Sequence, residues 1–281
     1  MICGVPQRTF PLLLPLLLAA CARAPSTPAP ARLDPAAFSG ERALYEAHAL
    51  VAVGPRVATT EGARRAAAHL RDRLQLHGVE AEIDTFADRT PQGRQPFCNV
   101  IGRLPGKQPG LILLGSHFDT KAGVGATFQG ANDSASSSGA LLELARVLAA
   151  SGWAGPELQF VFFDGEEALH NYGASDGLHG SRHHANRLVR ERRAGQVLGV
   201  IVLDMIGDRD LNVTIPRNGA PALAARVLRA AQAEGVRHRF ALYPYEIGDD
   251  HEPFLKAGMP AVDLIDFTFG SAPGRNDYWH T

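Results

Sequence analysis

The sequence has almost no net charge, because its 28 lysines and arginines nearly balance its 29 aspartates and glutamates. It also has no long run of like charges, no heptad pattern and no internal repeat. Nucleic-acid binding needs a basic surface, so this composition gives no reason to expect a nucleic-acid partner. A chain of 281 residues is long enough for one large domain and does not require two.

The front of the chain has the pattern of an export signal. Arg8 precedes a leucine-rich apolar stretch at 10–20, which suits a signal-peptide core and is too short to span a membrane. The run ends in Leu-Ala-Ala-Cys at 18–21, which resembles the bacterial lipoprotein box. We therefore expect a lipoprotein signal peptide at 1–20 and a lipid anchor on Cys21; ordinary signal cleavage is the alternative. The anchor would hold the domain on a membrane of the cell envelope, at the periplasmic or extracellular face, without spanning it.

Cysteine is scarce in the rest of the chain. Cys3 would be lost with the signal and Cys21 would be lipidated, so only Cys98 remains and no disulfide framework is available. We expect Cys98 to be a small, buried apolar side chain on a strand. Residues 21–38 are rich in proline, alanine and serine, which predicts a tether that adds nothing to the fold. The folded domain is expected at 39–281.

Helical and strand patterns alternate along this domain. Helical periodicity is expected at 41–53, 61–76, 134–150, 181–193 and 220–233, with a short turn at 253–257. Short apolar or alternating runs predict strands at 79–86, 97–104, 111–115, 158–163, 197–203 and 261–265. We therefore expect a single α/β domain of three layers, with a mixed, largely parallel sheet between helices. Residues 182–184 are expected to form a solvated helix start.

Two adjacent glutamates follow a buried strand. The run 158–163 stops at Asp-Gly-Glu-Glu, so Glu166 and Glu167 lie beyond its carboxyl end, where open α/β sheets bind ligands. Adjacent residues of an extended chain point in opposite directions, so one glutamate could bind a metal while the other moves protons. By itself, such a pair is more typical of a solvated acidic loop.

Matching groups occur at the ends of other predicted elements. They are His117, Asp119 and Asp204 after strands, Asp133 before a helix, and His280 after the last strand. Zinc accepts imidazole and carboxylate ligands alike, so this set predicts a zinc site at one edge of the sheet. Residues i and i+2 of an extended segment share a face, so Asp119 is expected to orient the imidazole of His117.

Five motifs in this order resemble the zinc exopeptidases of metallopeptidase family 28. They are Ser-His-Phe-Asp at 116–119, Gly-Ala-Asn-Asp-Ser at 130–134, Phe-Asp-Gly-Glu-Glu at 163–167, Leu-Asp-Met-Ile-Gly at 203–207 and Trp-His-Thr at 279–281. The resemblance covers nearly everything from about residue 41 to the end. It implies a zinc-dependent enzyme of this fold that acts on peptide or protein N-termini.

Within the family, the pattern leans toward glutaminyl-peptide cyclotransferases, which convert N-terminal glutamine to pyroglutamate and release ammonia. Gly-Ser-Arg-His at 180–183 and Asp-Asp-His at 249–251 are similar to theirs. The resemblance implies that the zinc ligands are Asp133, Glu167 and His280. It implies a catalytic set of Glu166 as general acid and base, with Asp204 and Asp249 beside it, and a substrate pocket lined by Trp279 and Tyr172.

A two-zinc aminopeptidase is the alternative activity. The resemblance then implies that His117, Asp133 and Asp204 hold a second zinc, with Asp133 bridging, so the number of zinc ions stays open. A binding module of the same fold, without activity, is a third possibility.

The sequence departs from the family pattern in two places. Asp263 stands where a histidine is expected in animal cyclases, and the loop 266–278 shows little similarity. Relatives also continue past the position of His280 into another helix, so we expect the sequence to be truncated at its C-terminal end. The sequence gives no expectation for oligomeric state.

Overall fold

The computed structural model describes Met1 and residues 33–125, 127–268, 270–272, 275–277 and 279–280. The chain divides into two units, Met1–Ala31 and Arg32–Thr281, and the fold described below is that of the second unit. The expected signal core, Cys21 and most of the expected tether lie outside the described residues. Within the described ranges, no helix has the length and apolarity needed to cross a membrane.

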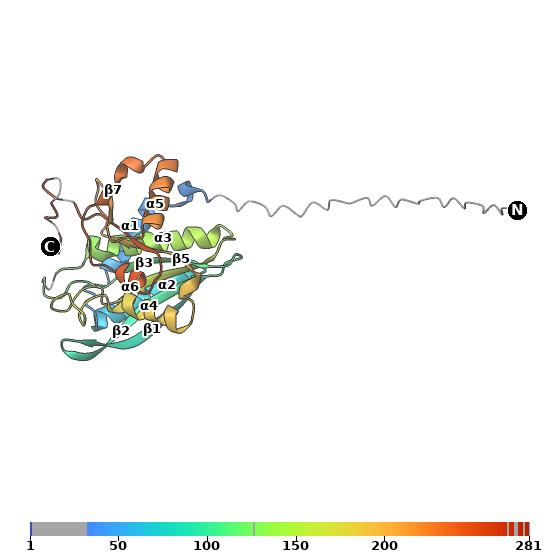
Figure 1. Ribbon diagram of the computed structural model, residues 1–281. Coiled ribbons are helices and arrows are strands. Elements are labelled where there is room, and N and C mark those ends of the chain that lie inside the picture. Colours follow the sequence, from blue (N-terminus) through green and yellow to red (C-terminus); the bar gives the residue numbers. More distant parts are fainter. Residues whose placement is uncertain (2–32, 126, 269, 273–274, 278, 281) are drawn as a thin grey trace. The chain divides into compact units, whose positions relative to one another are not determined.

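The central layer is an eight-stranded mixed sheet, with strand order β1-β2-β4-β3-β5-β8-β6-β7 (Figure 1). Its strands are β1 (Glu80–Thr90), β2 (Gly93–Leu104), β3 (Leu111–His117), β4 (Glu157–Phe163), β5 (Val197–Asp204), β6 (Val213–Pro216), β7 (Phe240–Tyr243) and β8 (Ala261–Ile265). The central neighbours β4, β3, β5 and β8 are parallel, whereas β2 is antiparallel to β4 and β6 is antiparallel to β8. The expected mixed, largely parallel sheet is confirmed.

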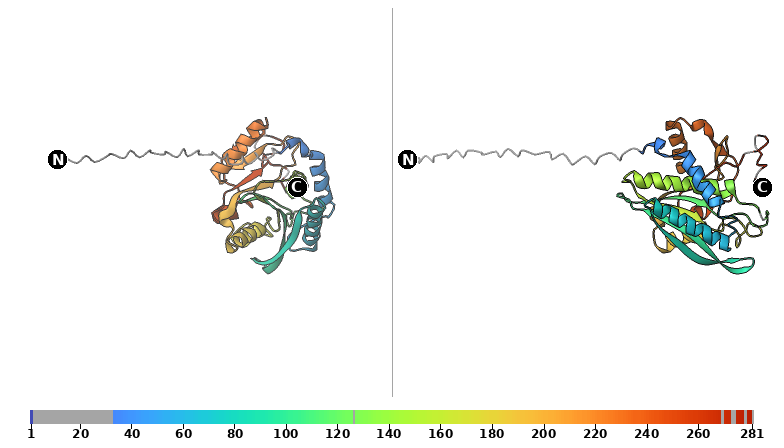
Figure 2. Two further views of the ribbon diagram at one scale, coloured as in Figure 1. Left: turned by 90° about the vertical axis from the view of Figure 1, so that its right-hand side faces the viewer. Right: turned by 180° about the vertical axis from the view of Figure 1, so that it is seen from behind.

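Helices cover both faces of this sheet (Figure 2). One face packs against α1 (Gly40–Val51), α2 (Glu61–Leu76), α3 (Ser137–Ala150) and α5 (Pro221–Ala233). The other packs against α4 (His179–Arg190) and α6 (Glu252–Lys256). The expected three-layer α/β/α arrangement is therefore confirmed.

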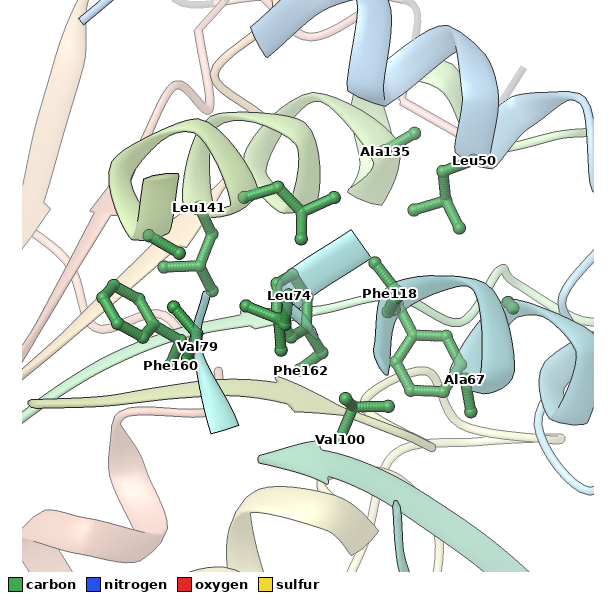
Figure 3. Packing of buried hydrophobic residues seen from close by; sticks show 14 of the residues in the cluster. Leu50, Ala67, Leu74, Val79, Val100, Phe118, Ala135, Leu141, Phe160 and Phe162 are labelled. Carbon is green, nitrogen blue, oxygen red and sulfur yellow. The ribbon is translucent and has the colours of Figure 1, made fainter. Parts of the chain in front are cut away.

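The two faces of β4 explain the two main hydrophobic cores. Successive strand residues point to opposite faces. Phe160 and Phe162 therefore pack under α2 and α3 (Figure 3). Val161 and Phe163 pack under α4 and α6 on the other face. All four side chains are fully buried, and each contributes about 1.5–3 kcal/mol of burial free energy. Cys98 is buried on β2, as expected.

Sequence patterns located α2 and β8 closely but misplaced other elements. β1 and β2 form a longer hairpin than expected, and α4 begins at His179. The expectation of a solvated start at 182–184 was wrong, because α4 lies against the sheet. His183 stacks on Phe86 with ring centroids 3.9 Å apart, and His184 is buried.

Candidate metal centre and active site

Parallel strands place polar residues at one edge of the sheet. β3 ends at His117, β5 ends at Asp204, and the glutamate pair follows β4. Asp133 lies in η2 (Ala131–Ser136), directly before α3, at a kink where its own backbone is not helical (φ −105°, ψ 90°). Side chains that are far apart in the sequence therefore meet at the carboxyl ends of the strands, where ligands of such sheets bind.

Asp133, Glu167 and His280 direct donor atoms toward one another, all within 4.8 Å. His280 Nε2 lies 2.8 Å from Glu167 Oε1 and 3.3 Å from Asp133 Oδ2. Burial opposes a charge on His280, but hydrogen bonds to both carboxylates raise its pKa to about 9. The same two carboxylates that favour a proton on His280 would favour a metal cation between the three side chains.

A second candidate metal group shares one residue with the first. His117, Asp133 and Asp204 also place donor atoms within 4.8 Å of one another. His117 Nε2 lies 3.0 Å from Asp133 Oδ1 and 3.2 Å from Asp204 Oδ1. Burial disfavours a charged His117, yet hydrogen bonds to Asp119, Asp133 and Asp204 together raise its pKa well above the usual range. One oxygen of Asp133 thus faces each group, as a bridging carboxylate requires.

Asp119 contacts both His117 and the glutamate pair. Its Oδ1 lies 3.4 Å from His117 Nδ1, on the side where it was expected to orient the imidazole. Its two oxygens also accept hydrogen bonds from the backbone N–H groups of Glu166 and Glu167, each at 3.2 Å. Sequence reasoning missed this second contact, because a backbone donor from another loop leaves no residue pattern.

The two adjacent glutamates have different partners. Glu167 contacts His280 through one oxygen and lies 3.5 Å from Lys121 Nζ through the other. Glu166 accepts a hydrogen bond from the Tyr172 hydroxyl. Burial, and after it the nearby charges of Glu167 and Asp249, raise the pKa of Glu166 well above its ordinary value, although His117 opposes the shift. Burial raises the pKa of Glu167 as well, so it is the partners that distinguish the two: Glu167 contacts His280 of the metal group, whereas Glu166 bonds to the Tyr172 hydroxyl.

Further buried carboxylates lie beside Glu166. Burial, then the charges of Asp204 and Asp250, raise the pKa of Asp249 well above its usual value. Asp263 on β8 is fully buried, and burial followed by the charge of Asp249 raises its pKa in the same direction. Sequence reasoning noted Asp263 only as a departure from animal cyclases and missed its place in this acidic cluster.

A cavity of about 400 Å³ adjoins these groups. Its polar lining includes the glutamate pair, Asp133, Asp204, Asp249 and His280, and its apolar lining includes Tyr172, Tyr243, Ile247, Ile265, Phe267 and Trp279. Trp279 stacks on His280 with centroids 4.4 Å apart and meets the edge of Phe267 at 5.4 Å. Tyr172 and Trp279 thus line the cavity where the resemblance placed them. Sequence reasoning missed Tyr243, which ends the four-residue strand β7, and Phe267, which lies in the loop after β8 that has little similarity to the family.

The family model for Peptidase family M28 matches residues 99–281 of the chain. The chain belongs to peptidase family M28. The five motifs that suggested this family lie on the loops and strand ends described above. Thr281, the last residue of the fifth motif, lies outside the described residues.

Individual M28 relatives include both cyclases and peptidases. A glutaminyl-peptide cyclotransferase of Boiga irregularis is 31% identical, over 76% of this chain and 66% of the relative, so the chain spans about two-thirds of that protein. The crystal structure of an Acidobacteriales bacterium glutaminyl cyclase is 32% identical, with a TM-score of 0.79 over 90% of this chain and 86% of that one. A leucine aminopeptidase precursor from Bacteroides thetaiotaomicron is 25% identical, with a TM-score of 0.74 over 87% and 88% of the two chains.

Proposed function

We propose that this M28 chain is a zinc-dependent glutaminyl cyclase, which converts N-terminal glutamine of peptides or proteins to pyroglutamate. The main support is the convergence of Asp133, Glu167 and His280 beside Glu166 on one cavity. Curated relatives that are 28–32% identical to the chain are named as glutaminyl-peptide cyclotransferases, which favours the cyclase.

The donor set fits zinc. One imidazole nitrogen and two carboxylates are three protein ligands of the kind that catalytic zinc sites use, with a fourth position left for substrate. When bound, zinc supplies a Lewis acid that polarises an amide carbonyl. The ligands Asp133 and Glu167 are buried, and His280 is stacked against Trp279, so the surroundings restrict the orientation of all three.

Glu166 is placed to move the proton that cyclisation requires. The α-nitrogen of the substrate attacks the side-chain carbonyl carbon, a C–N bond forms, and the bond to the amide nitrogen breaks. Glu166 takes one proton from the α-nitrogen and returns it to the departing nitrogen, which leaves as ammonia. The carboxylate ends in its starting state. Its raised pKa, caused first by burial, suits both the acceptance and the return of the proton.

The two parts of the cavity fit the two parts of an N-terminal residue. The acidic lining, which includes Asp204 and Asp249, offers hydrogen-bond acceptors to the α-amino group, which attacks as the neutral amine. Trp279 and Phe267 offer aromatic surface for the aliphatic part of the side chain. The Tyr172 hydroxyl bonds to Glu166 and restricts the orientation of that carboxylate.

The aminopeptidase remains the second candidate because of one observation. His117, Asp133 and Asp204 form a complete second group of donors beside the first, and Asp133 contacts the histidines of both. With two ions bound, Glu166 would take a proton from water instead of from an α-nitrogen.

One pair of substrates tests the proposal. The purified protein with zinc is incubated with a glutamine-first peptide and with a matched leucine-first peptide. We expect ammonia and a pyroglutamyl peptide from the first and no free leucine from the second. Free leucine without ammonia would support the aminopeptidase instead. A stable protein that releases neither product and binds no zinc would support the binding module.

We further propose that the protein is exported to a bacterial cell envelope and anchored through a lipid on Cys21. The support is the signal pattern at 8–21 in the sequence. Expression of wild-type protein and of Cys21→Ser in a bacterium, followed by membrane fractionation, tests this. Wild type should sediment with membranes and carry lipid mass, and the variant should not; equal fractionation without lipid would contradict it.

A further inference from the structure

A fully buried arginine lies against both ends of the connection between β3 and η2, next to His117 and Asp133. Arg56, in the connection between α1 and α2, has no exposed surface. A buried charge costs several kcal/mol unless hydrogen bonds satisfy its donors. At Arg56 three of those bonds go to backbone carbonyls more than sixty residues away in the sequence, and a longer one goes to the Gly54 carbonyl at 3.4 Å.

The guanidinium joins the two ends of the connection 118–130 between β3 and η2. Arg56 Nε donates to the Phe118 carbonyl at 2.7 Å, Nη1 donates to the Gln129 carbonyl at 2.8 Å, and Nη2 donates to the Gly130 carbonyl at 3.1 Å. The backbone N–H of Arg56 also donates to Thr120 Oγ1 at 3.0 Å. One side chain therefore fixes two segments that have no strand pairing with each other.

Both segments lead directly into candidate metal ligands. Phe118 lies between His117 and Asp119, so its carbonyl belongs to the peptide next to both. Gly130 begins the turn that ends at Asp133, and it has a left-handed φ of 53°. A β-carbon at Gly130 would lie 2.1 Å from the Asp133 carbonyl oxygen, so the turn is tight and requires glycine. The carbonyl of Gly130 itself accepts the hydrogen bond from Arg56.

Only arginine offers this arrangement of donors. The guanidinium is a planar fork with five N–H groups in fixed directions, whereas lysine has one charged nitrogen. The three carbonyls each bond to a different guanidinium nitrogen, Nε, Nη1 or Nη2. Lysine at position 56 would keep the charge but could not reach all three carbonyls at once.

The charge of Arg56 should weaken the binding of a metal cation, whereas its hydrogen bonds should strengthen that binding. Burial lowers the pKa of Arg56 to about 10, against the attraction of Asp119 and Asp133, so the group is charged at neutral pH. A buried positive charge repels a metal ion nearby, whereas ordered loops present Asp133 and His117 in a fixed geometry. These two effects predict opposite results when the arginine is replaced.

We propose that Arg56 is a positioning residue for the metal centre, because its guanidinium fixes the loops of His117 and Asp133. The inference rests on the proposed zinc site and adds the group that holds the zinc-binding residues in place. Arg56 is not among the residues that line the cavity, so the proposed role acts through His117 and Asp133.

Zinc affinity of three variants tests the inference. Arg56→Met removes both the charge and the guanidinium donors, whereas Arg56→Lys keeps the charge and removes the guanidinium. Arg73→Met is the matched control. Arg73 bonds to Glu46 between α2 and α1, with a Nε–Oε2 distance of 2.8 Å, and contacts no residue of the site. Zinc dissociation constants come from competition with a chelator, and melting temperatures are measured without metal.

We expect both Arg56 variants to bind zinc about 10- to 100-fold more weakly than wild type, as loss of a ligand-orienting group does elsewhere. Arg73→Met should lower the melting temperature and leave zinc affinity unchanged. Tighter zinc binding by Arg56→Met with an unchanged Arg56→Lys would show an electrostatic effect alone and overturn the inference. A lower melting temperature with unchanged zinc affinity in both would also overturn it. Arg56→Lys keeps the experiment decisive if Arg56→Met does not fold.

The same measurements separate this inference from the proposed function. Wild-type protein that binds no zinc contradicts the zinc enzyme itself. Tight zinc binding by wild type and by both Arg56 variants contradicts only the role of Arg56.

Discussion

Glu166 is buried beside two other carboxylates, Glu167 and Asp249, and this environment raises its pKa. Glu167, its neighbour in the chain, contacts His280 instead and lies in the candidate metal group. At the scale of single residues, two adjacent glutamates therefore have different proposed roles: Glu167 is a metal ligand, and Glu166 is the general acid and base. Their roles stay predictions until the two residues are changed separately.

Replacement of Glu166 by Gln should abolish turnover and leave zinc bound. The amide keeps the size of the side chain but cannot accept the proton, so we expect a loss of about 10²- to 10⁴-fold in kcat. Zinc content by mass spectrometry should equal that of wild type. The exposed Glu61→Gln is the matched control and should change neither quantity. Full activity in Glu166→Gln would remove Glu166 from the mechanism.

The raised pKa of Glu166 also predicts the acid side of the pH profile. A base works only when it is deprotonated, so the rate should fall as pH decreases through its pKa. Burial places that pKa above the ordinary glutamate value of about 4.3. The rate should therefore begin to fall at a higher pH than an exposed glutamate would require. A rate that stays constant down to about pH 4 would contradict the assignment.

Sequence patterns could predict the acidic and imidazole residues but not the buried positive charge beside them. Glu166 and Glu167 follow an apolar run that stops abruptly, which marks the end of a strand. Arg56 has no such context, because its burial depends on carbonyls of the loops at 118 and 129–130. Asp263 sits inside an apolar strand, and its contacts come from a loop that carries no regular pattern.

At the scale of elements, polar contacts fasten α4 to the β1–β2 hairpin. Asp84 of β1 accepts hydrogen bonds from His183 at 3.2 Å and from Arg187 at 2.9 Å. Burial opposes the charge on Asp84, but these two partners outweigh it and lower its pKa to about 2. The contact explains why α4 lies against the sheet through His183, which sequence reasoning placed in solvent.

Asp84→Asn should destabilise the folded protein by about 1–2 kcal/mol at pH 7. This is less than the lowered pKa of Asp84 would give by itself, because solvent partly screens the contact. A lowered folded pKa stabilises the protein above the unfolded pKa of about 3.9, and the effect is lost as pH falls toward 2. Chemical denaturation should therefore show a gap between variant and wild type that narrows below pH 4. The exposed Asp72→Asn should show almost no gap. A gap that widens in acid would contradict the contact.

Short elements were the least predictable part of the fold. β6 and β7 have four residues each, too few for an alternating pattern to stand out, and β7 has mostly exposed side chains. α2 was predictable because its buried residues recur at the spacing of a helix, and β4 because six consecutive residues, 158–163, form one buried, mostly apolar run. Pocket residues such as Tyr243 come from these short elements, which explains why they were missed.

At the scale of the whole domain, parallel strands bring distant residues to one edge. His117, Asp204 and the glutamate pair follow β3, β5 and β4, which are neighbours in the sheet. Asp133 and His280 reach the same place from η2 and from the C-terminal segment. The central claim is that this meeting point binds zinc through Asp133, Glu167 and His280.

The most direct test is the zinc content of purified protein after dialysis, compared among wild type, His280→Ala and the exposed control His48→Ala. We predict about one zinc ion or more per chain in wild type and in His48→Ala. His280→Ala should lose the ion held by Asp133, Glu167 and His280. Zinc content in His280→Ala equal to that of wild type, or wild-type protein that retains no zinc, would contradict the account.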